Sequence, residues 1–215
     1  MLAAHPCFGV LTASQQKRLV ADARLFIFPA EETVQVEGET AVGIWWIESG
    51  AVKIYKSNME GSEQILHIAG MGDTFNDVAV YDDDGNPATV DTLTPAKIWL
   101  LPGATIHKLL GENNAFAQAV IRSMARRVRA FTRQIEDLTL YSVTARLARF
   151  LLQEADNPAF MEAGVTRKAI ASYLATTPET VSRTLRLLQD AGAIQFDRYR
   201  IMIVNASLLR TIGRV

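Results

Sequence analysis

The sequence has one cysteine, Cys7, in 215 residues. A single thiol excludes an intramolecular disulfide and any four-cysteine metal cluster within one chain. Such sparing use of cysteine is typical of proteins that stay in a reducing compartment, so we expect a cytoplasmic location. Histidine is also scarce, because the chain has only three isolated histidines and no zinc-type spacing.

Long hydrophobic runs are missing as well. The most apolar windows, such as the one around residues 98–102, are far shorter than the roughly 20 residues that cross a bilayer. The N-terminal residues have no positively charged segment ahead of an apolar stretch. We therefore expect no membrane span and no secretory signal.

Positive charge is scarce in the first half of the chain. Residues 1–112 hold seven Lys and Arg against 15 Asp and Glu, whereas residues 113–140 hold five against two and residues 141–215 hold 10 against six. The total of −1 hides this division into an acidic and a basic half. Because phosphate attraction depends on local positive charge, the basic half is a candidate nucleic-acid contact surface.

Short segments rich in β-branched and aromatic residues fill residues 24–101. Glycines fall between them some 11 or 12 residues apart, at positions 38, 50, 61 and 72, and Glu60-Gly61 fits a hairpin turn. This pattern predicts an antiparallel sandwich or jelly-roll barrel in a first domain, residues 1–112. The expected strands are Arg24–Phe28, Val34–Glu37, Ile44–Glu48, Val52–Tyr55, Gln64–Ile68, Ala88–Thr92 and Ile98–Leu101.

A segment without glycine or proline runs from about Asn114 to Asp137 and predicts a long helix. Its apolar residues are spaced as in a coiled-coil seam, and five arginines leave only a narrow apolar face. A narrow seam favours pairing with a second copy, so residues 113–140 are predicted to dimerise; packing on the chain's own barrel is the alternative. The seam residues are Met124, Val128, Phe131, Ile135 and Leu138.

Residues 141–215 are predicted to form helices and then a short hairpin. Ser142 or Thr144 can cap a first helix through Gln153, and a looser region follows at Asp156-Asn157-Pro158. The remaining elements are a helix after Thr166 at Arg167–Leu174, a turn at Ala175-Thr176, a second helix from Pro178 to about Asp190, and a hairpin of Ile194–Phe196 and Ile201–Val204 with its tip at 197–200. This order defines a winged helix-turn-helix, which makes the whole chain α+β.

The second of these helices has a polar front. Thr177 can cap it and Pro178 fits its first position, while Glu179, Ser182 and Arg183 share one face. Such side chains can bond base edges in the major groove, arginine to guanine above all. A solvated face with a Glu179–Arg183 ion pair is the alternative. The candidate DNA-contact residues are Thr177, Glu179, Thr180, Ser182, Arg183, Arg186 and Arg167.

The run TRKAIASYLATTPETVSRTLRLLQDAGAIQFDRYRIMIVN, residues 166–205, resembles the DNA-binding domain of the CRP/FNR family of bacterial transcription regulators. VEGETAVGIWWIESGAVKIYKSNMEGSEQILHIAGMGDTF is similar to the family's cyclic-nucleotide-binding-type β-roll, and residues 114–138 are similar to its dimerisation helix. The ordered combination covers nearly the whole chain. It implies a homodimer that binds double-stranded DNA and acts with RNA polymerase.

The resemblance also implies a type of DNA site. A Glu-x-x-Ser-Arg front, here Glu179, Ser182 and Arg183, resembles the FNR branch, which reads TTGAT-type half-sites. The CRP branch typically has arginine where Pro178 stands and commonly has glycine where Ser182 stands. We therefore expect an FNR-like inverted repeat instead of TGTGA-type half-sites.

The sensor region departs from the family's cyclic-nucleotide cassette. Asn76-Asp77 stands for the usual Gly-Glu, and Pro87-Ala88 stands where an Arg-Ser pair would hold the cyclic phosphate. The run of aspartates at 82–84 would repel an anion. We expect a degenerate pocket that binds neither cyclic AMP nor cyclic GMP; the aspartates fit a solvated loop, with calcium binding as the alternative.

The few cysteine and histidine residues also bear on other sensors and on enzyme functions. One cysteine cannot supply an iron–sulfur cluster, whereas a haem could in principle use His5, Cys7 or His67, and His107 fits a surface position. No cofactor is predicted, and a haem- or small-molecule-sensing regulator stays the alternative. Three isolated histidines do not make the His-x-His pair of a metal-binding cupin, so no enzyme is expected. A ligand-binding module without DNA function would leave residues 166–205 unexplained.

Overall fold

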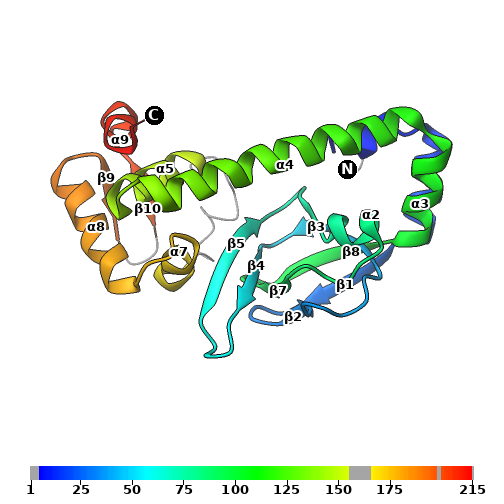
Figure 1. The fold of residues 1–215 in the computed structure, drawn as a ribbon, viewed down its shortest axis with the longest axis horizontal. Helices are drawn as coiled ribbons and strands as arrows, with labels where there is room; N and C mark the ends of the chain where they lie inside the picture. The colour runs from blue at the N-terminus through cyan, green and yellow to red at the C-terminus, as the bar shows by residue number, and fades with distance from the viewer. Residues whose placement is uncertain (1–4, 155–165, 198–199, 215) are drawn as a thin grey trace. The chain divides into compact units, whose positions relative to one another are not determined.

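The computed structural model describes residues 5–154, 166–197 and 200–214 (Figure 1). The chain divides into two compact units: unit 1 comprises residues 1–56 and 68–131, and unit 2 comprises residues 57–67 and 132–215. The predicted loose region at Asp156–Pro158 lies outside the described residues. Within the described part of the chain, no helix is both long and apolar enough to span a bilayer.

Two antiparallel four-stranded sheets are ordered β1-β8-β3-β6 and β2-β7-β4-β5, and apart from residues 57–67 their strands lie in unit 1. Aromatic and aliphatic side chains fill the space between them, Trp45, Phe75 and Ile98 among them. The seven predicted strands are all present with ends within two residues of expectation, and the two-residue β6 was not predicted. The strands are β1 (Arg24–Phe28), β2 (Thr33–Gln35), β3 (Gly43–Ser49), β4 (Val52–Ser57), β5 (Glu63–Ala69), β6 (Thr74–Phe75), β7 (Thr89–Thr92) and β8 (Ala96–Pro102).

Helical segments cover the outer face of the first sheet. The side chains of Ile44 and Trp46 on β3 and Leu101 on β8 pack in one buried cluster with Leu109 and Phe116. This explains why β3 is buried on both faces. The segments are η2 (Phe8–Val10), α1 (Ala13–Asp22), α2 (Asp77–Asp82), α3 (Gly103–Glu112) and the long α4 (Asn114–Leu140).

The helix α4 confirms the predicted long helix and extends three residues beyond its expected end. The carboxamide oxygen of Asn113 accepts a hydrogen bond from the backbone N–H of Phe116 at 3.0 Å, which caps the first turn. Phe116, Ala119 and Val120 are buried in the core of unit 1. The helix therefore begins as a core element, and its packing on that core continues to Met124 in the third turn.

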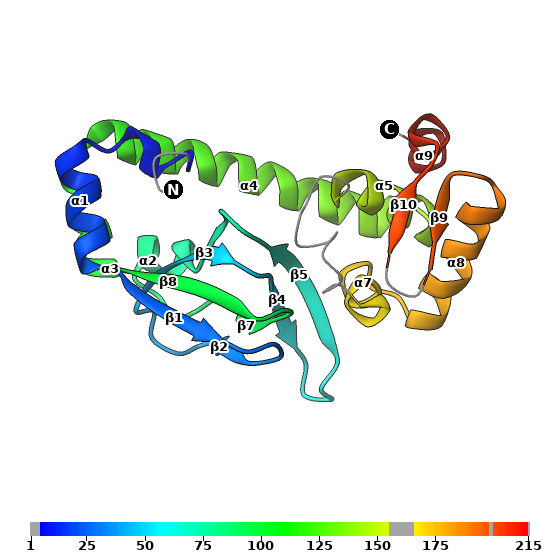
Figure 2. The ribbon, with the colours of Figure 1, turned by 180° about the vertical axis from the view of Figure 1, so that it is seen from behind.

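Unit 2 contains the predicted winged helix-turn-helix and one unpredicted helix (Figure 2). The hydroxyl of Ser142 accepts from the N–H of Ala145 at 3.3 Å, so Ser142 is the capping residue of the first helix. One apolar cluster joins the helices, with Leu147, Leu151 and Leu209 fully buried. The elements are α5 (Val143–Glu154), α7 (Arg167–Tyr173), α8 (Pro178–Asp190), β9 (Ile194–Phe196), β10 (Ile201–Ile203) and α9 (Ala206–Gly213).

The hairpin turn between β4 and β5 forms part of unit 2 by its contacts. The hydroxyl of Ser172 on α7 donates to the carbonyl of Glu63 at 2.6 Å and accepts from the N–H of Ile65 at 3.1 Å. The side-chain amide of Gln64 donates to the carbonyl of Tyr173 at 3.3 Å. Since β5 lies at the edge of its sheet, Ser172 satisfies backbone groups that no further strand would pair. The predicted boundaries at 112/113 and 140/141 stay a prediction.

Candidate nucleic-acid interface and sensor cavity

The helix α8 begins as its sequence predicts. The hydroxyl of Thr177 accepts from the backbone N–H of Thr180 at 3.2 Å and lies 3.1 Å from the Thr180 hydroxyl, and Pro178 occupies the first helical position. The preceding helix α7 is capped in the same way by Thr166. Ala175, in the turn between the two helices, has a left-handed backbone with φ of 48°.

The two faces of α8 have opposite environments. Val181, Leu185 and Leu188 are buried and belong to the same cluster as Ile170 and Leu174 of the preceding helix and turn. Glu179, Arg183 and Arg186 are exposed, and Ser182 and Thr180 are half-buried. The predicted polar front is therefore the open face of a helix whose back is fixed in a core.

The chemistry of that front suits hydrogen bonding to bases. A hydrogen bond from its own backbone N–H and one from Thr177 lower the pKa of the Glu179 carboxyl, so at neutral pH it is an ionised acceptor. Among the described residues no ion pair joins Glu179 to Arg183. The guanidinium of Arg183 is exposed and carries five N–H donors.

Further positive charge lies on α7 and at the start of the wing. Arg167 and Lys168 are the first two residues of α7, and both are exposed. The Arg167 guanidinium carbon lies 5.6 Å from the centre of the Phe196 ring on β9, a contact that sequence reasoning missed. Asp197 and Arg200 close the wing, with the Arg200 N–H donating to the Asp197 carboxylate at 2.8 Å. Residues 198 and 199 of the predicted tip lie outside the described residues.

Part of the predicted seam on α4 is an exposed apolar stripe. Val128 and Ile135 are each 63% exposed and Phe131 is 45% exposed. Met124 packs against the core of unit 1, and Leu138 is half-buried in unit 2. Ile121, 67% exposed, continues the heptad spacing backwards and was missed, whereas Phe116 and Val120 before it are buried in the core of unit 1.

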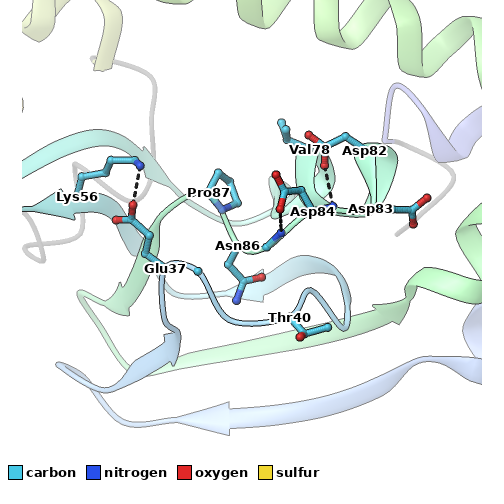
Figure 3. A pocket seen from close by; sticks show the side chains of 11 residues that line it. Glu37, Thr40, Lys56, Val78, Asp82, Asp83, Asp84, Asn86 and Pro87 are labelled. Atoms are coloured by element: carbon cyan, nitrogen blue, oxygen red, sulfur yellow. Dashed lines mark hydrogen bonds and ion pairs between the residues drawn. The ribbon is translucent and has the colours of Figure 1, made fainter.

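A cavity of about 460 Å3 lies on the surface of unit 1, where the cyclic-nucleotide cassette was expected (Figure 3). The only lysine in its lining, Lys56, pairs with Glu37 at 2.6 Å. Three consecutive aspartates also line the cavity. Among the residues that the structure describes, only Asp83 has a basic side chain within ion-pair distance, His107 at 3.6 Å. The lining residues are Glu37, Gly38, Thr40, Lys56, Val78, Asp82, Asp83, Asp84, Gly85, Asn86 and Pro87.

Of the four predicted pocket residues, only Pro87 lines this cavity. Asn76 is buried with a left-handed φ of 64°, and its side-chain amide donates to the Asn86 carboxamide oxygen at 2.9 Å. Its carboxamide oxygen accepts from Gln35 at 3.1 Å, and the carbonyl of buried Ala88 accepts from the same Gln35 amide at 3.2 Å. These hydrogen bonds connect three segments of the chain, and of the residues that form them Asn86 lines the cavity.

The fourth predicted pocket residue, Asp77, does not line the cavity. Its carboxylate is buried and forms an ion pair with Arg127 of α4. The sequence placed Asp77 in the degenerate pocket, and the structure gives its carboxylate a cationic partner within unit 1. Only the fold brings Asp77 and Arg127 together, so no local signal in the sequence could have shown the pair.

Two of the three haem candidates, His5 and Cys7, are neighbours near the start of the chain, and the third, His67, lies on β5. The Cys7 thiol is buried, donates to the carbonyl of Ala119 at 3.7 Å, and has its pKa raised by burial. Burial lowers the pKa of His5, whose ring accepts from the Cys7 N–H at 3.2 Å, and His67 is exposed on β5. No group of three or more His, Cys, Asp or Glu side chains in the described part of the chain is arranged to hold a metal ion.

Comparison with known proteins agrees with this architecture. The family described as "Cyclic nucleotide-binding domain" matches residues 25–113, and "Crp-like helix-turn-helix domain" matches residues 145–212. The chain is 26% identical to the cAMP-activated global transcriptional regulator CRP of Haemophilus influenzae, over 92% of this chain and 95% of that protein. It is 27% identical to the probable transcriptional regulator flp of Lacticaseibacillus casei, over 94% and 96%.

Among solved structures, FixK2 from Bradyrhizobium japonicum superposes with a TM-score of 0.81 at 24% identity, over 88% of this chain and 96% of FixK2. The fold and the two domain matches together define a transcription regulator with a DNA-binding helix-turn-helix and a cyclic-nucleotide-binding-like domain. The chain belongs to the CRP/FNR family.

Proposed function

We propose that this regulator works as a homodimer that places one α8 in each of two adjacent major grooves of a palindromic DNA site. The observation that carries this proposal is the open polar face of α8 above a fully buried apolar back. A helix-turn-helix presents the N-terminal residues of its second helix to base edges, and these are the residues at positions 177–183. A two-fold dimer requires half-sites about one turn of DNA apart.

The expected half-site is of the TTGAT type. The exposed Arg183 guanidinium can donate two bonds to guanine, and the ionised Glu179 can accept from a cytosine amino group. Pro178 supplies no side-chain donor at the position where the CRP branch typically has arginine. Recovery of TTGAT-type inverted repeats in a selection from random DNA would support this assignment, and recovery of TGTGA-type half-sites would contradict it.

The exposed stripe on α4 supports the dimer. Ile121, Val128 and Ile135 lie one heptad apart on a helix that has already left the core of unit 1, and each is more than 60% exposed. Pairing with a second copy would remove this apolar surface from water. RNA polymerase is the expected partner of the DNA-bound dimer.

Control by cyclic nucleotide is not part of the proposed function. An anionic phosphate would enter a cavity that has Pro87 and three aspartates in its lining and whose one lysine is already paired. We also propose that neither haem nor an iron–sulfur cluster is the sensor. A buried thiol with a raised pKa is a poor source of the thiolate that binds iron.

A gel shift with genomic fragments at two salt concentrations tests the function as a whole. Retention of a small set of fragments that weakens steeply with salt supports a sequence-specific regulator, because phosphate contacts release counterions. Equal retention of every fragment, or none at low salt, would leave a ligand-binding module without specific DNA recognition.

A further inference from the structure

Arg167 and Phe196 come from the two elements on either side of α8 in the sequence. Arg167 is the first residue of α7, and Phe196 is the last residue of β9, where the wing begins. The guanidinium carbon lies 5.6 Å from the ring centre, within the range of a cation–π contact. Phe196 is half-buried against the core of unit 2, whereas Arg167 is exposed. The ring is therefore anchored, and the cation rests on it from the solvent side.

Stacking restrains the arginine without using its hydrogen bonds. The face of a guanidinium packs on a ring while its N–H groups stay in the plane and point outward. A freely moving arginine loses rotamer entropy when it binds a ligand, and a side chain that is already restrained loses less. An anchored ring under an exposed guanidinium thus prepares Arg167 to bind a planar or tetrahedral anion.

The surroundings favour a DNA phosphate as that anion. The first helix of a helix-turn-helix crosses the DNA backbone while the second enters the groove. Arg167 and Lys168 are exposed cations at the start of this first helix, and neither forms an ion pair among the described residues. Phosphate contacts of this kind fix the register of the protein on the duplex.

We propose that Phe196 is a positioning residue for DNA binding, which acts by holding the Arg167 guanidinium ready for a backbone phosphate. Phe196 itself does not touch DNA. The proposal rests on the DNA-binding function proposed above. It adds Phe196, a residue at the start of the wing, which would support DNA binding without contacting a base.

A double-mutant cycle in the full-length chain tests the proposal on the palindrome recovered by selection. F196L should weaken binding roughly two- to five-fold per half-site while Arg167 is present, which is the range of an exposed cation–π contact. In the R167A background, F196L should change the affinity by less than the error of the measurement. F196Y keeps an aromatic face and should retain the affinity of the original chain.

Lys168 provides the matched control, because it adjoins Arg167 and makes no ring contact among the described residues. K168A and R167A should each make the plot of log affinity against log salt less steep, by about one unit of slope per half-site, because each removes one phosphate contact. F196L should lower the slope only where Arg167 is present, and its effect should add to that of K168A. Thermal unfolding confirms that each variant is folded before binding is compared.

Equal losses from F196L with and without Arg167 would overturn the positioning role and leave Phe196 a packing residue. No loss from F196L in either background would overturn it as well. If the unmodified chain binds no palindromic site, the DNA-binding function fails and the positioning role fails with it. The two failures are distinguishable. A failure of the DNA-binding function appears already with the unmodified chain, whereas a failure of the positioning role appears only when the variants are compared.

Discussion

Arg183 is the residue on which the proposed base recognition depends most. Val181 and Leu185 on the inner face of α8 are buried, whereas the side chain of Arg183 itself is exposed. Arg183→Ala should therefore leave the free energy of unfolding within about 0.5 kcal/mol of its original value. The same change should cost about 1–3 kcal/mol of binding per half-site and relax the preference for guanine at one position.

Binding curves on the selected palindrome and on a copy with that guanine replaced measure this prediction. Arg129→Ala is a suitable control, since Arg129 is an exposed arginine on α4 outside the helix-turn-helix. Equal discrimination between the two DNA sites by the Arg183→Ala variant would remove Arg183 from base recognition.

Ala175 offers a prediction about stability. Its φ of 48° is left-handed, a conformation that costs a residue with a Cβ roughly 1 kcal/mol more than glycine. Because the gain from removing this strain exceeds the added entropy of the unfolded chain, Ala175→Gly should stabilise the protein by about 0.5 kcal/mol. Urea denaturation with an unchanged m-value measures the difference.

Ala130→Gly is the matched control, because Ala130 is also exposed and lies inside the helix α4. There the same change should destabilise by about 1 kcal/mol. The same sign at both positions would show that the left-handed turn is not the source of the effect.

The helix α4 carries the prediction about assembly. Ile135→Glu should place two like charges at the two-fold seam, where burying a charge is costly. We expect the dimer dissociation constant to rise at least roughly 100-fold, which corresponds to about 3 kcal/mol. Because Ile135 is 63% exposed in the single chain, the fold should survive. Sedimentation equilibrium measures the association state.

Ala130→Glu adds the same charge to another face of α4 and should leave the dimer intact, since Ala130 is exposed and lies off the seam. Dissociation by both substitutions to the same extent would mean that added charge alone separates the subunits. A stable dimer in the Ile135→Glu variant would place the subunit interface elsewhere.

Local sequence signals predicted the elements whose cause is local. The caps at Thr166 and Thr177, the long helix and seven strands follow from capping residues, spacing and β-branched content. The helix α1 was missed although its capping box at Thr12 and Gln15 was readable, because the sequence there has no marked apolar period. The apolar residues of strand β1 are typical of a buried strand, yet Ile27 is 72% exposed. Strand β1 lies at the edge of its sheet, and the burial of an edge strand depends on which other element covers it.

The cavity of unit 1 could be predicted only in part, because some of its features depend on contacts between residues far apart in the sequence. The loss of a basic residue at Pro87 and the run of aspartates are visible in the sequence and do lie in the cavity lining. The pairing of Asp77 with Arg127 is not visible, since it joins residues 50 positions apart. The amide network of Gln35, Asn76 and Asn86 is likewise a product of three separate segments.

The expected response of the proposed dimer to cyclic nucleotides follows from the charges around that cavity. A ligand changes the DNA affinity of a regulator only through its different affinities for two conformations, and a ligand that does not bind changes nothing. Cyclic AMP at roughly 1 mM, which is about 1,000 times the dissociation constant of an ordinary micromolar site, should therefore leave DNA affinity and thermal midpoint unchanged. Calorimetry should detect no heat of binding. The variant Pro87→Arg, which supplies the missing cation, is the matched comparison. If the unmodified chain binds cyclic AMP with micromolar affinity, the acidic lining does not prevent nucleotide binding. The proposed cyclic-nucleotide independence is then wrong.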